Sequence, residues 1–151
     1  EIVKMVSQVN AVMSLAPGSI GAEIATDIIG SGEVLRISRD VIEPFYRRKA
    51  TRAVEILREK LDGVDFHIHQ PEGAIFLWLW LRGMPITCDE LYRRLKKRGV
   101  LVVPGHYFFP GLAEDWRHKN ECIRINYAPD EAIVERGLKI IAEEVRRAYE
   151  V

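Results

Sequence analysis

The apolar positions at the start of the chain recur with the period of an amphipathic helix. From Ile2 to Ala16 they follow the 3.6-residue repeat, and the Pro-Gly pair at 17–18 ends the pattern. Ser19 is a residue type that caps helices, so we expect a second short helix from there through Ile29, before a Gly-Ser-Gly stretch breaks it.

A longer helix is predicted from Ser38 to about Leu61. Pro44 lies near its start, and a proline has no backbone N–H and collides with the preceding turn. We therefore expect Pro44 to mark the first turn of this helix or to kink it.

The pattern then changes to that of strands. Residues 64–69 alternate between apolar and polar, and residues 74–81 are continuously apolar, which is typical of a central strand covered on both faces. Thr87 followed by Glu90 forms a capping box, which predicts a helix that ends at Gly99.

The last part of the chain predicts two more strands and a helix. Residues 100–103 and 122–128 are apolar enough for strands, a long loop separates them, and Pro129-Asp130 can cap a final helix. From residue 38 onward the order of elements fits an α+β fold, with helices packed on a small sheet. Residues 1–37 are helical throughout, and their apolar faces need a partner surface.

Composition narrows the class of protein. The 151 residues are 48% hydrophobic and 29% charged, as in globular proteins, and 22 basic residues balance 22 acidic ones. This balance gives no overall attraction to nucleic acid or to an anionic membrane. Cys88 and Cys122 lack the spacing of a metal cluster or a disulfide framework, so we expect a reducing compartment, the cytoplasm.

Arg124 is the residue that most directly suggests chemistry. It lies in the predicted strand from Cys122 to Asn126. Strand alternation places its side chain on the same face as those of Cys122 and Asn126. One interpretation is a polar strand face in solvent. The other is a carboxylate clamp, because the planar guanidinium matches a carboxylate with two parallel hydrogen bonds. The strand pattern alone favours neither.

Other candidates carry less information. The loop Val103 to Gly111 is rich in aromatic residues between two Pro-Gly pairs, which suggests either a functional loop or a satellite apolar cluster folded over the sheet end. His67 and His69 share a strand face, but ordinary exposed histidines explain them better than a metal site does. The basic clusters near Arg47 and Arg93 alternate with acidic residues, as on solvated helix faces.

Three motifs in order carry a resemblance to a known family. They are Pro71-Glu-Gly-Ala-Ile-Phe-Leu-Trp78, then Val103-Pro-Gly-His-Tyr-Phe-Phe-Pro-Gly111, then Ile123-Arg-Ile-Asn-Tyr-Ala128. Together they resemble the C-terminal part of the class I and II aminotransferases, which are pyridoxal phosphate enzymes of fold type I. In their detailed sequence, the motifs resemble those of family members that exchange amino groups between valine or alanine and 2-oxo acids such as pyruvate and 2-oxoisovalerate.

The resemblance implies specific roles. Arg124 would bind the substrate α-carboxylate, Asn126, Tyr107 and Phe108 would border the substrate, and Ser19 would lie near the cofactor phosphate. Residues 1–37 would be helices of the large, cofactor-binding domain, and residues 38–151 the small C-terminal domain with a mainly antiparallel sheet. The implied cofactor is pyridoxal 5'-phosphate, and the implied assembly is a homodimer.

One departure from the family limits these expectations. The family uses a lysine in a Ser-x-x-Lys context to bind the cofactor and move the proton, and none of the lysines here has that context. The resemblance therefore implies a fragment that is inactive alone. The alternative is a stand-alone α+β module that binds an amino acid through Arg124, or an interaction domain that binds no ligand.

Overall fold

The computed structural model describes residues 2–13, 20–112 and 114–150. Its internal contacts divide the chain into two compact units, residues 1–42 and 43–151. No helix in the described parts of the chain is both long enough and apolar enough to cross a membrane.

The first unit is helical, as the apolar spacing predicts. It contains α1 (Ile2–Met13), α2 (Ile20–Gly30), the short α3 (Glu33–Ile37) and a π-helical stretch, η1 (Ser38–Ile42). The apolar side chains of α1 are exposed, so this helix buries none of its residues within the described chain.

The predicted start of the long helix at Ser38 was wrong. The helical backbone already begins at Glu33, after Gly32 with its left-handed φ of 74°. Pro44 lies in the first turn of α4 (Glu43–Lys60), as expected, and the wider π-helical turns of η1 directly precede it. A proline at this position cannot donate to the carbonyl four residues earlier, and a π-helical stretch is one way to accommodate that loss.

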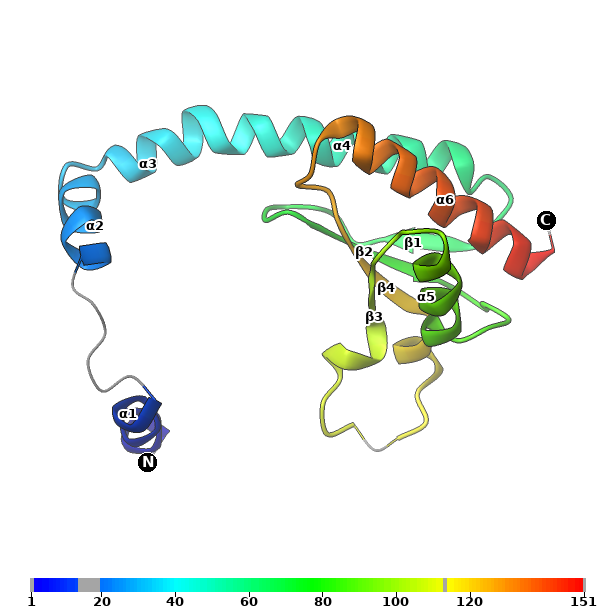
Figure 1. Ribbon diagram of the computed structural model, residues 1–151, viewed down its shortest axis with the longest axis horizontal. Coiled ribbons are helices and arrows are strands. Elements are labelled where there is room, and N and C mark those ends of the chain that lie inside the picture. The colour runs from blue at the N-terminus through cyan, green and yellow to red at the C-terminus, as the bar shows by residue number, and fades with distance from the viewer. Residues whose placement is uncertain (1, 14–19, 113, 151) are drawn as a thin grey trace. The chain divides into compact units, whose positions relative to one another are not determined.

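The second unit is built on a four-stranded sheet with the order β1-β2-β4-β3 (Figure 1). Its strands are β1 (Phe66–Ile68), β2 (Phe76–Leu81), β3 (Val103–Pro104) and β4 (Cys122–Asn126), and every neighbouring pair is antiparallel. The long apolar strand β2 is central, as predicted. The strand expected at residues 100–103 is shorter, because its ladder with β4 begins at Val103.

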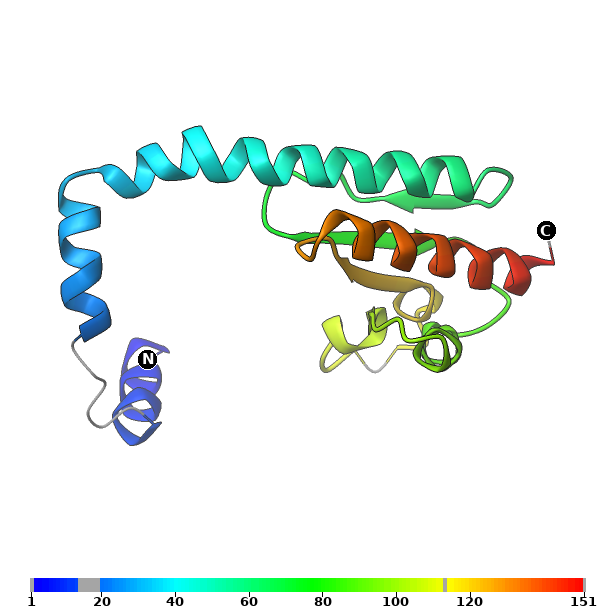
Figure 2. The same cartoon turned by 45° about the horizontal axis from the view of Figure 1, so that its top comes forward.

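Three helices accompany the sheet. Helices α4 and α6 (Glu131–Tyr149) lie side by side along one face of it (Figures 1 and 2). Helix α5 (Cys88–Lys97) packs against α6 and β3, and the Thr87 hydroxyl accepts a 3.2 Å hydrogen bond from the Glu90 N–H, which confirms the predicted cap. Asp130 precedes α6, but its side chain makes no capping hydrogen bond.

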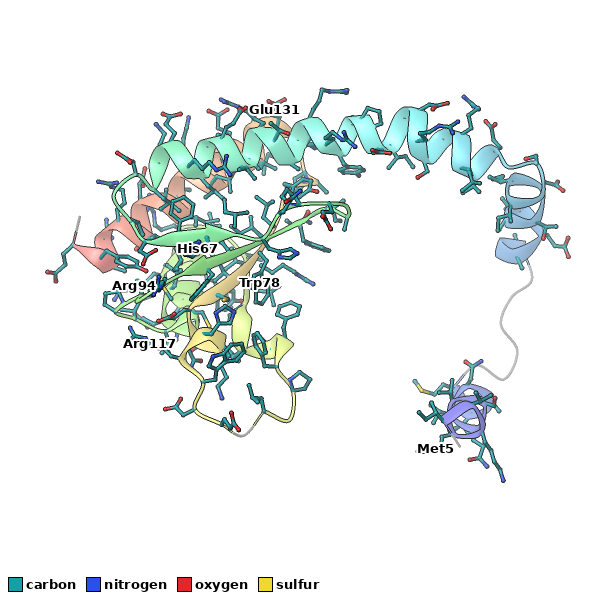
Figure 3. The ribbon with its side chains drawn as sticks, turned by 180° about the vertical axis from the view of Figure 1, so that it is seen from behind. Met5, His67, Trp78, Arg94, Arg117 and Glu131 are labelled. Carbon is teal, nitrogen blue, oxygen red and sulfur yellow. The ribbon has the colours of Figure 1, made fainter. Side chains whose placement is uncertain are left out.

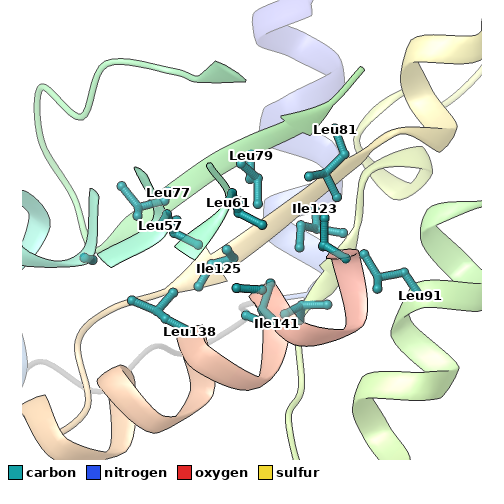
Figure 4. Packing of buried hydrophobic residues seen from close by; sticks show 14 of the residues in the cluster. Leu57, Leu61, Leu77, Leu79, Leu81, Leu91, Ile123, Ile125, Leu138 and Ile141 are labelled. Atoms are coloured by element: carbon teal, nitrogen blue, oxygen red, sulfur yellow. The ribbon is translucent and has the colours of Figure 1, made fainter. Parts of the chain in front are cut away.

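The core lies between the sheet and these helices. Figure 4 shows leucine and isoleucine side chains of β2 and β4 meeting those of α4, α5 and α6. Each such side chain stabilises the fold by about 1.5–3 kcal/mol when fully buried. One face of β2 is buried in this core, whereas its other face is half-buried. The expectation of full cover on both faces therefore holds for one face, and the half-buried face carries the candidate site.

Candidate functional site

The half-buried face of the sheet gathers aromatic and polar side chains. Alternation along β2 places Phe76, Trp78 and Trp80 on this face, and Trp78 lies directly opposite Arg124 of β4 in the register. The neighbouring positions Ile123 and Ile125 point into the core. The same two-residue period that builds the core therefore brings Arg124 out among the aromatic residues.

Arg124 contacts rings, and its charge has no acidic partner in the described chain. Its guanidinium carbon lies over the Phe76 ring, 4.1 Å from the ring centroid, and over the Phe108 ring at 4.9 Å. Among the residues that the structure describes, no carboxylate comes within 4.0 Å of its nitrogens. A half-buried, weakly hydrated guanidinium in this state can accept an external anion.

A hollow of about 270 Å³ lies beside the guanidinium. Arg124, Phe76 and Trp78 line it from the sheet, and the turn from His69 to Gly73 lines it from the end of the β1–β2 connection. Its volume suits a small molecule of the size of an amino acid. The sequence-based alternative of an arginine on a plain solvent face does not describe this environment.

The loop between β3 and β4, the aromatic loop, folds over the half-buried face of the sheet. Its aromatic side chains form a cluster there. Phe108 meets Trp78 edge to face with their ring centroids 5.1 Å apart, and Phe109 meets Trp116 at 5.3 Å (Figure 3, where Trp78 is labelled). His118 stacks on Trp116 and touches Trp80. The interpretation as a satellite aromatic cluster is confirmed. Through Phe108 the loop also contacts Arg124, and its functional role stays a prediction.

Gly105 fixes where this loop leaves the sheet. A Cβ atom there would lie 2.7 Å from both the Cβ and the backbone oxygen of Cys122. Real Cβ atoms do not approach that closely, so a side chain at this position would displace the loop. The glycine of the Val-Pro-Gly motif therefore allows the loop and β4 to touch.

Glu121 was missed by the sequence analysis. It is 5% exposed, and its carboxylate accepts hydrogen bonds from the Trp80 indole N–H at 2.9 Å and from the Gly83 backbone N–H at 3.1 Å. The same carboxylate forms an ion pair with Arg117, whose Nε lies 2.5 Å from Glu121 Oε1. Glu121 thus ties β2 to the end of the aromatic loop. The sequence gives no signal for this, because a glutamate before a strand is usually exposed.

The other predicted site residues have different surroundings. Tyr107 is 67% exposed, and its ring packs on His106 at 4.2 Å. Asn126 is exposed, and its side-chain oxygen accepts a 2.8 Å hydrogen bond from the Ala128 N–H. Ser19 lies outside the described residues.

Phe76 was also missed as a site residue. The sequence places it in a continuous apolar run, which gives no reason to single it out. In the structure it is the residue of β2 whose ring lies under the guanidinium.

The remaining candidates have structural explanations. His67 lies beside Trp80 and 3.7 Å from Asp65, and no group of three or more potential metal ligands occurs within the described part of the chain. Part of the basic clusters is paired on its own helix, as with Arg93 and Asp89 at 2.8 Å and Arg94 and Glu90 at 3.0 Å, whereas Arg98 pairs with Glu143 and Glu144 of α6. Solvated helix faces are confirmed for these pairs.

Comparison with known proteins identifies the family. Residues 4–141 match the model of the family described as aminotransferase class I and II. The chain belongs to this family. It is 47% identical over 149 residues to the valine–pyruvate aminotransferase of Escherichia coli K12, a match that covers 99% of this chain and 36% of that protein.

Solved structures agree with this assignment. A valine-pyruvate aminotransferase from Salmonella typhimurium superposes with a TM-score of 0.88 at 47% identity, over 98% of this chain and 38% of that one. A protein from Psychrobacter arcticum named "Putative amino-acid aminotransferase" superposes with a TM-score of 0.89 at 45% identity, over 99% of this chain and 34% of that one. The chain therefore spans about a third of the length of these relatives, and the expected fold, part of a fold type I aminotransferase, is confirmed.

The family uses pyridoxal 5'-phosphate. The hollow beside Arg124 is lined by no lysine. Lys49 instead donates to the backbone oxygens of Ala128 and Pro129, and Lys119 to that of Glu114. A covalent bond to the cofactor aldehyde requires a lysine amine beside the substrate. The described residues that line the hollow beside Arg124 therefore include no amine for that bond.

Proposed function

We propose that this chain is the carboxylate-binding part of a pyridoxal phosphate-dependent aminotransferase. In the complete protein it moves the amino group between valine or alanine and 2-oxo acids such as pyruvate and 2-oxoisovalerate. The match to relatives named as valine–pyruvate aminotransferases supports this substrate class. The apolar walls that Phe76 and Trp78 give the hollow suit an aliphatic side chain.

One observation carries the role of Arg124. Its guanidinium lines the hollow, and Glu72, which lines the same hollow, is not within ion-pair distance of it. The in-plane N–H donors of Arg124 therefore remain available for two parallel bonds to a carboxylate. Hydrogen bonds to charged groups contribute about 1.5–3 kcal/mol each. Two such bonds match the roughly 4 kcal/mol of millimolar substrate binding.

The test is Arg124→Lys in the complete enzyme. Lysine keeps the charge but cannot form the two-pronged contact, so we expect kcat/KM for valine to fall by about 10- to 100-fold. For isobutylamine, which is valine without its carboxylate, kcat/KM should be the same in Arg124→Lys as in wild type. Arg94→Lys is the matched control, because Arg94 pairs with Glu90 on the surface of α5. An unchanged kcat/KM for valine in Arg124→Lys would refute the proposed role.

The remaining parts of the proposal concern the rest of the enzyme. We propose that residues 1–37 belong to its large domain, that Ser19 lies near the cofactor phosphate, and that Asn126 and Tyr107 border the substrate. We also propose a homodimer, because exposed apolar residues along α1, such as Val6 and Val9, favour burial against another surface.

An activity assay of the isolated chain tests the proposal that it is only part of the enzyme. Without a lysine beside Arg124, the 151-residue chain should produce no alanine from valine and pyruvate when mixed with pyridoxal phosphate. The complete enzyme is the positive control. Turnover by the isolated chain would contradict the proposal.

A stand-alone amino-acid-binding module is the second candidate. It is favoured by the fact that Arg124, Phe76 and Phe108 all come from the unit formed by residues 43–151. Calorimetry of the chain with valine, in the absence of pyridoxal phosphate, distinguishes the two. Saturable heat at millimolar valine would support the module, whereas no heat would exclude it.

A further inference from the structure

We propose that Phe76 and Phe108 are positioning residues that fix the plane of the Arg124 guanidinium, and that Phe108 makes carboxylate binding depend on the aromatic loop. This inference rests on the proposed function of Arg124. It adds two residues that touch the arginine, one from the sheet and one from the loop.

Stacking on a ring constrains the guanidinium without using its donors. The guanidinium carbon lies over both rings. All five N–H bonds of arginine lie in the plane of the group, so a guanidinium that stacks flat on a ring keeps these donors free. Phe76 and Phe108 therefore hold Arg124 and leave its edge free for a carboxylate. An arginine held only by its own flexible side chain would have to lose that freedom each time a substrate binds.

Phe76 is the fixed half of this arrangement. It lies at the start of β2, paired with Asn126 in the register, and its ring is the closer of the two to the guanidinium. The neighbouring residue Leu77 is fully buried in the core, so the backbone under Phe76 is anchored.

Phe108 is the half that comes from the loop. It ends the 3₁₀ turn η2 (Gly105–Phe108), and besides Arg124 it contacts the edge of Trp78. The next residue, Phe109, meets Trp116 and His118, and its ring centroid also lies 6.3 Å from that of Trp78. Arg124 is not among the aromatic or cation contacts of Phe109 in the described chain, so Phe108 is the one of the two adjacent phenylalanines that contacts the arginine.

The experiment replaces each ring in the complete enzyme, with Phe109→Leu as the matched control. Phe76→Leu and Phe108→Leu should each raise KM for valine by about tenfold, which corresponds to about 1.4 kcal/mol, with a smaller change in kcat. Phe76→Tyr and Phe108→Tyr keep the ring face and should leave KM near that of wild type. Activity with isobutylamine should stay unchanged, because it has no carboxylate to orient.

The outcomes distinguish this inference from the function on which it rests. If both leucine variants raise KM no more than Phe109→Leu does, the positioning role is overturned, provided that Arg124→Lys still loses activity. If Arg124→Lys also leaves KM and kcat unchanged, the proposed function fails with it. Should Phe76→Leu not fold, Phe108→Leu decides alone, because Phe108 is 40% exposed and outside the core.

Discussion

The hydroxyl of Tyr127 donates a 2.7 Å hydrogen bond to the backbone oxygen of Ala74, a residue that lies 53 positions earlier in the chain. The Tyr127 N–H also donates to the Ile75 oxygen at 3.0 Å. Ala74 has a left-handed backbone with φ of 60°, which is costly for a residue with a Cβ atom. Tyr127 therefore holds the turn that borders the hollow beside Arg124 in a conformation that its sequence does not favour.

Tyr127→Phe is expected to destabilise the protein by about 1 kcal/mol, the usual net contribution of one hydrogen bond. The ring stays in the core, where Tyr127 is 2% exposed, so the loss isolates the hydroxyl. The midpoint of urea unfolding measures it. Tyr107→Phe, at an exposed hydroxyl, is the control, and an equal shift in both variants would contradict this role for Tyr127.

Ala74→Gly is expected to stabilise the protein slightly. Relief of the left-handed backbone is worth about 1–2 kcal/mol, whereas the greater freedom of glycine in the unfolded chain costs about 0.5–1 kcal/mol. The net gain is roughly 0.5 kcal/mol, visible as a higher melting temperature. Ala53→Gly in the middle of α4 should do the opposite. A lower melting temperature in Ala74→Gly would show that the turn is not strained.

Much of the fold follows from local patterns in the sequence. The alternation along β4 correctly separates Ile123 and Ile125 from Arg124, and the capping box at Thr87 marks the start of α5. The start of the long helix was mistaken, because Gly32 gives no sign of acting as a cap when Ser38 offers a better capping residue type.

The candidate site could be predicted only in part. The motif around Arg124 indicates the family. However, the two rings that contact its guanidinium, those of Phe76 and Phe108, are 32 positions apart in the sequence. Such a contact depends on the strand register and on the path of the loop, which no local pattern encodes. The buried state of Glu121 likewise arises from partners on β2 and in the turn after it.

Gly105→Ala is expected to weaken both stability and substrate binding. The added Cβ would lie 2.7 Å from the Cys122 backbone oxygen and 2.9 Å from that of Lys119, and backbone atoms cannot move aside cheaply. Overpacking of this kind costs about 1–3 kcal/mol, and the shift would carry Phe108 away from Arg124. Urea unfolding and KM for valine in the complete enzyme measure the two effects.

Gly137→Ala is the control for this substitution, because the space around Gly137 in α6 is open. It should be neutral or stabilising by up to about 1 kcal/mol, with KM unchanged. If Gly105→Ala behaves in the same way, the loop does not depend on the close contact with Cys122.

Cys122 is expected to make the protein less stable in alkali. Burial raises the pKa of its thiol from 9.0 to about 12, with the nearby Trp78 indole opposing this and Cys88 adding to it. Above pH 9 the unfolded chain loses this proton while the folded chain keeps it, so the free energy of unfolding falls as pH rises toward 12. Cys122→Ala removes the titration and leaves an offset that does not change with pH. Urea unfolding of both proteins at pH 7 to 10 should show their stability difference constant below about pH 8 and changing above pH 9, to the disadvantage of wild type. Parallel curves up to pH 10 would show that the folded thiol ionises as readily as the unfolded one. The tyrosines, whose pKa values burial also raises in Tyr127 and Tyr149, are present in both proteins and cancel in the comparison.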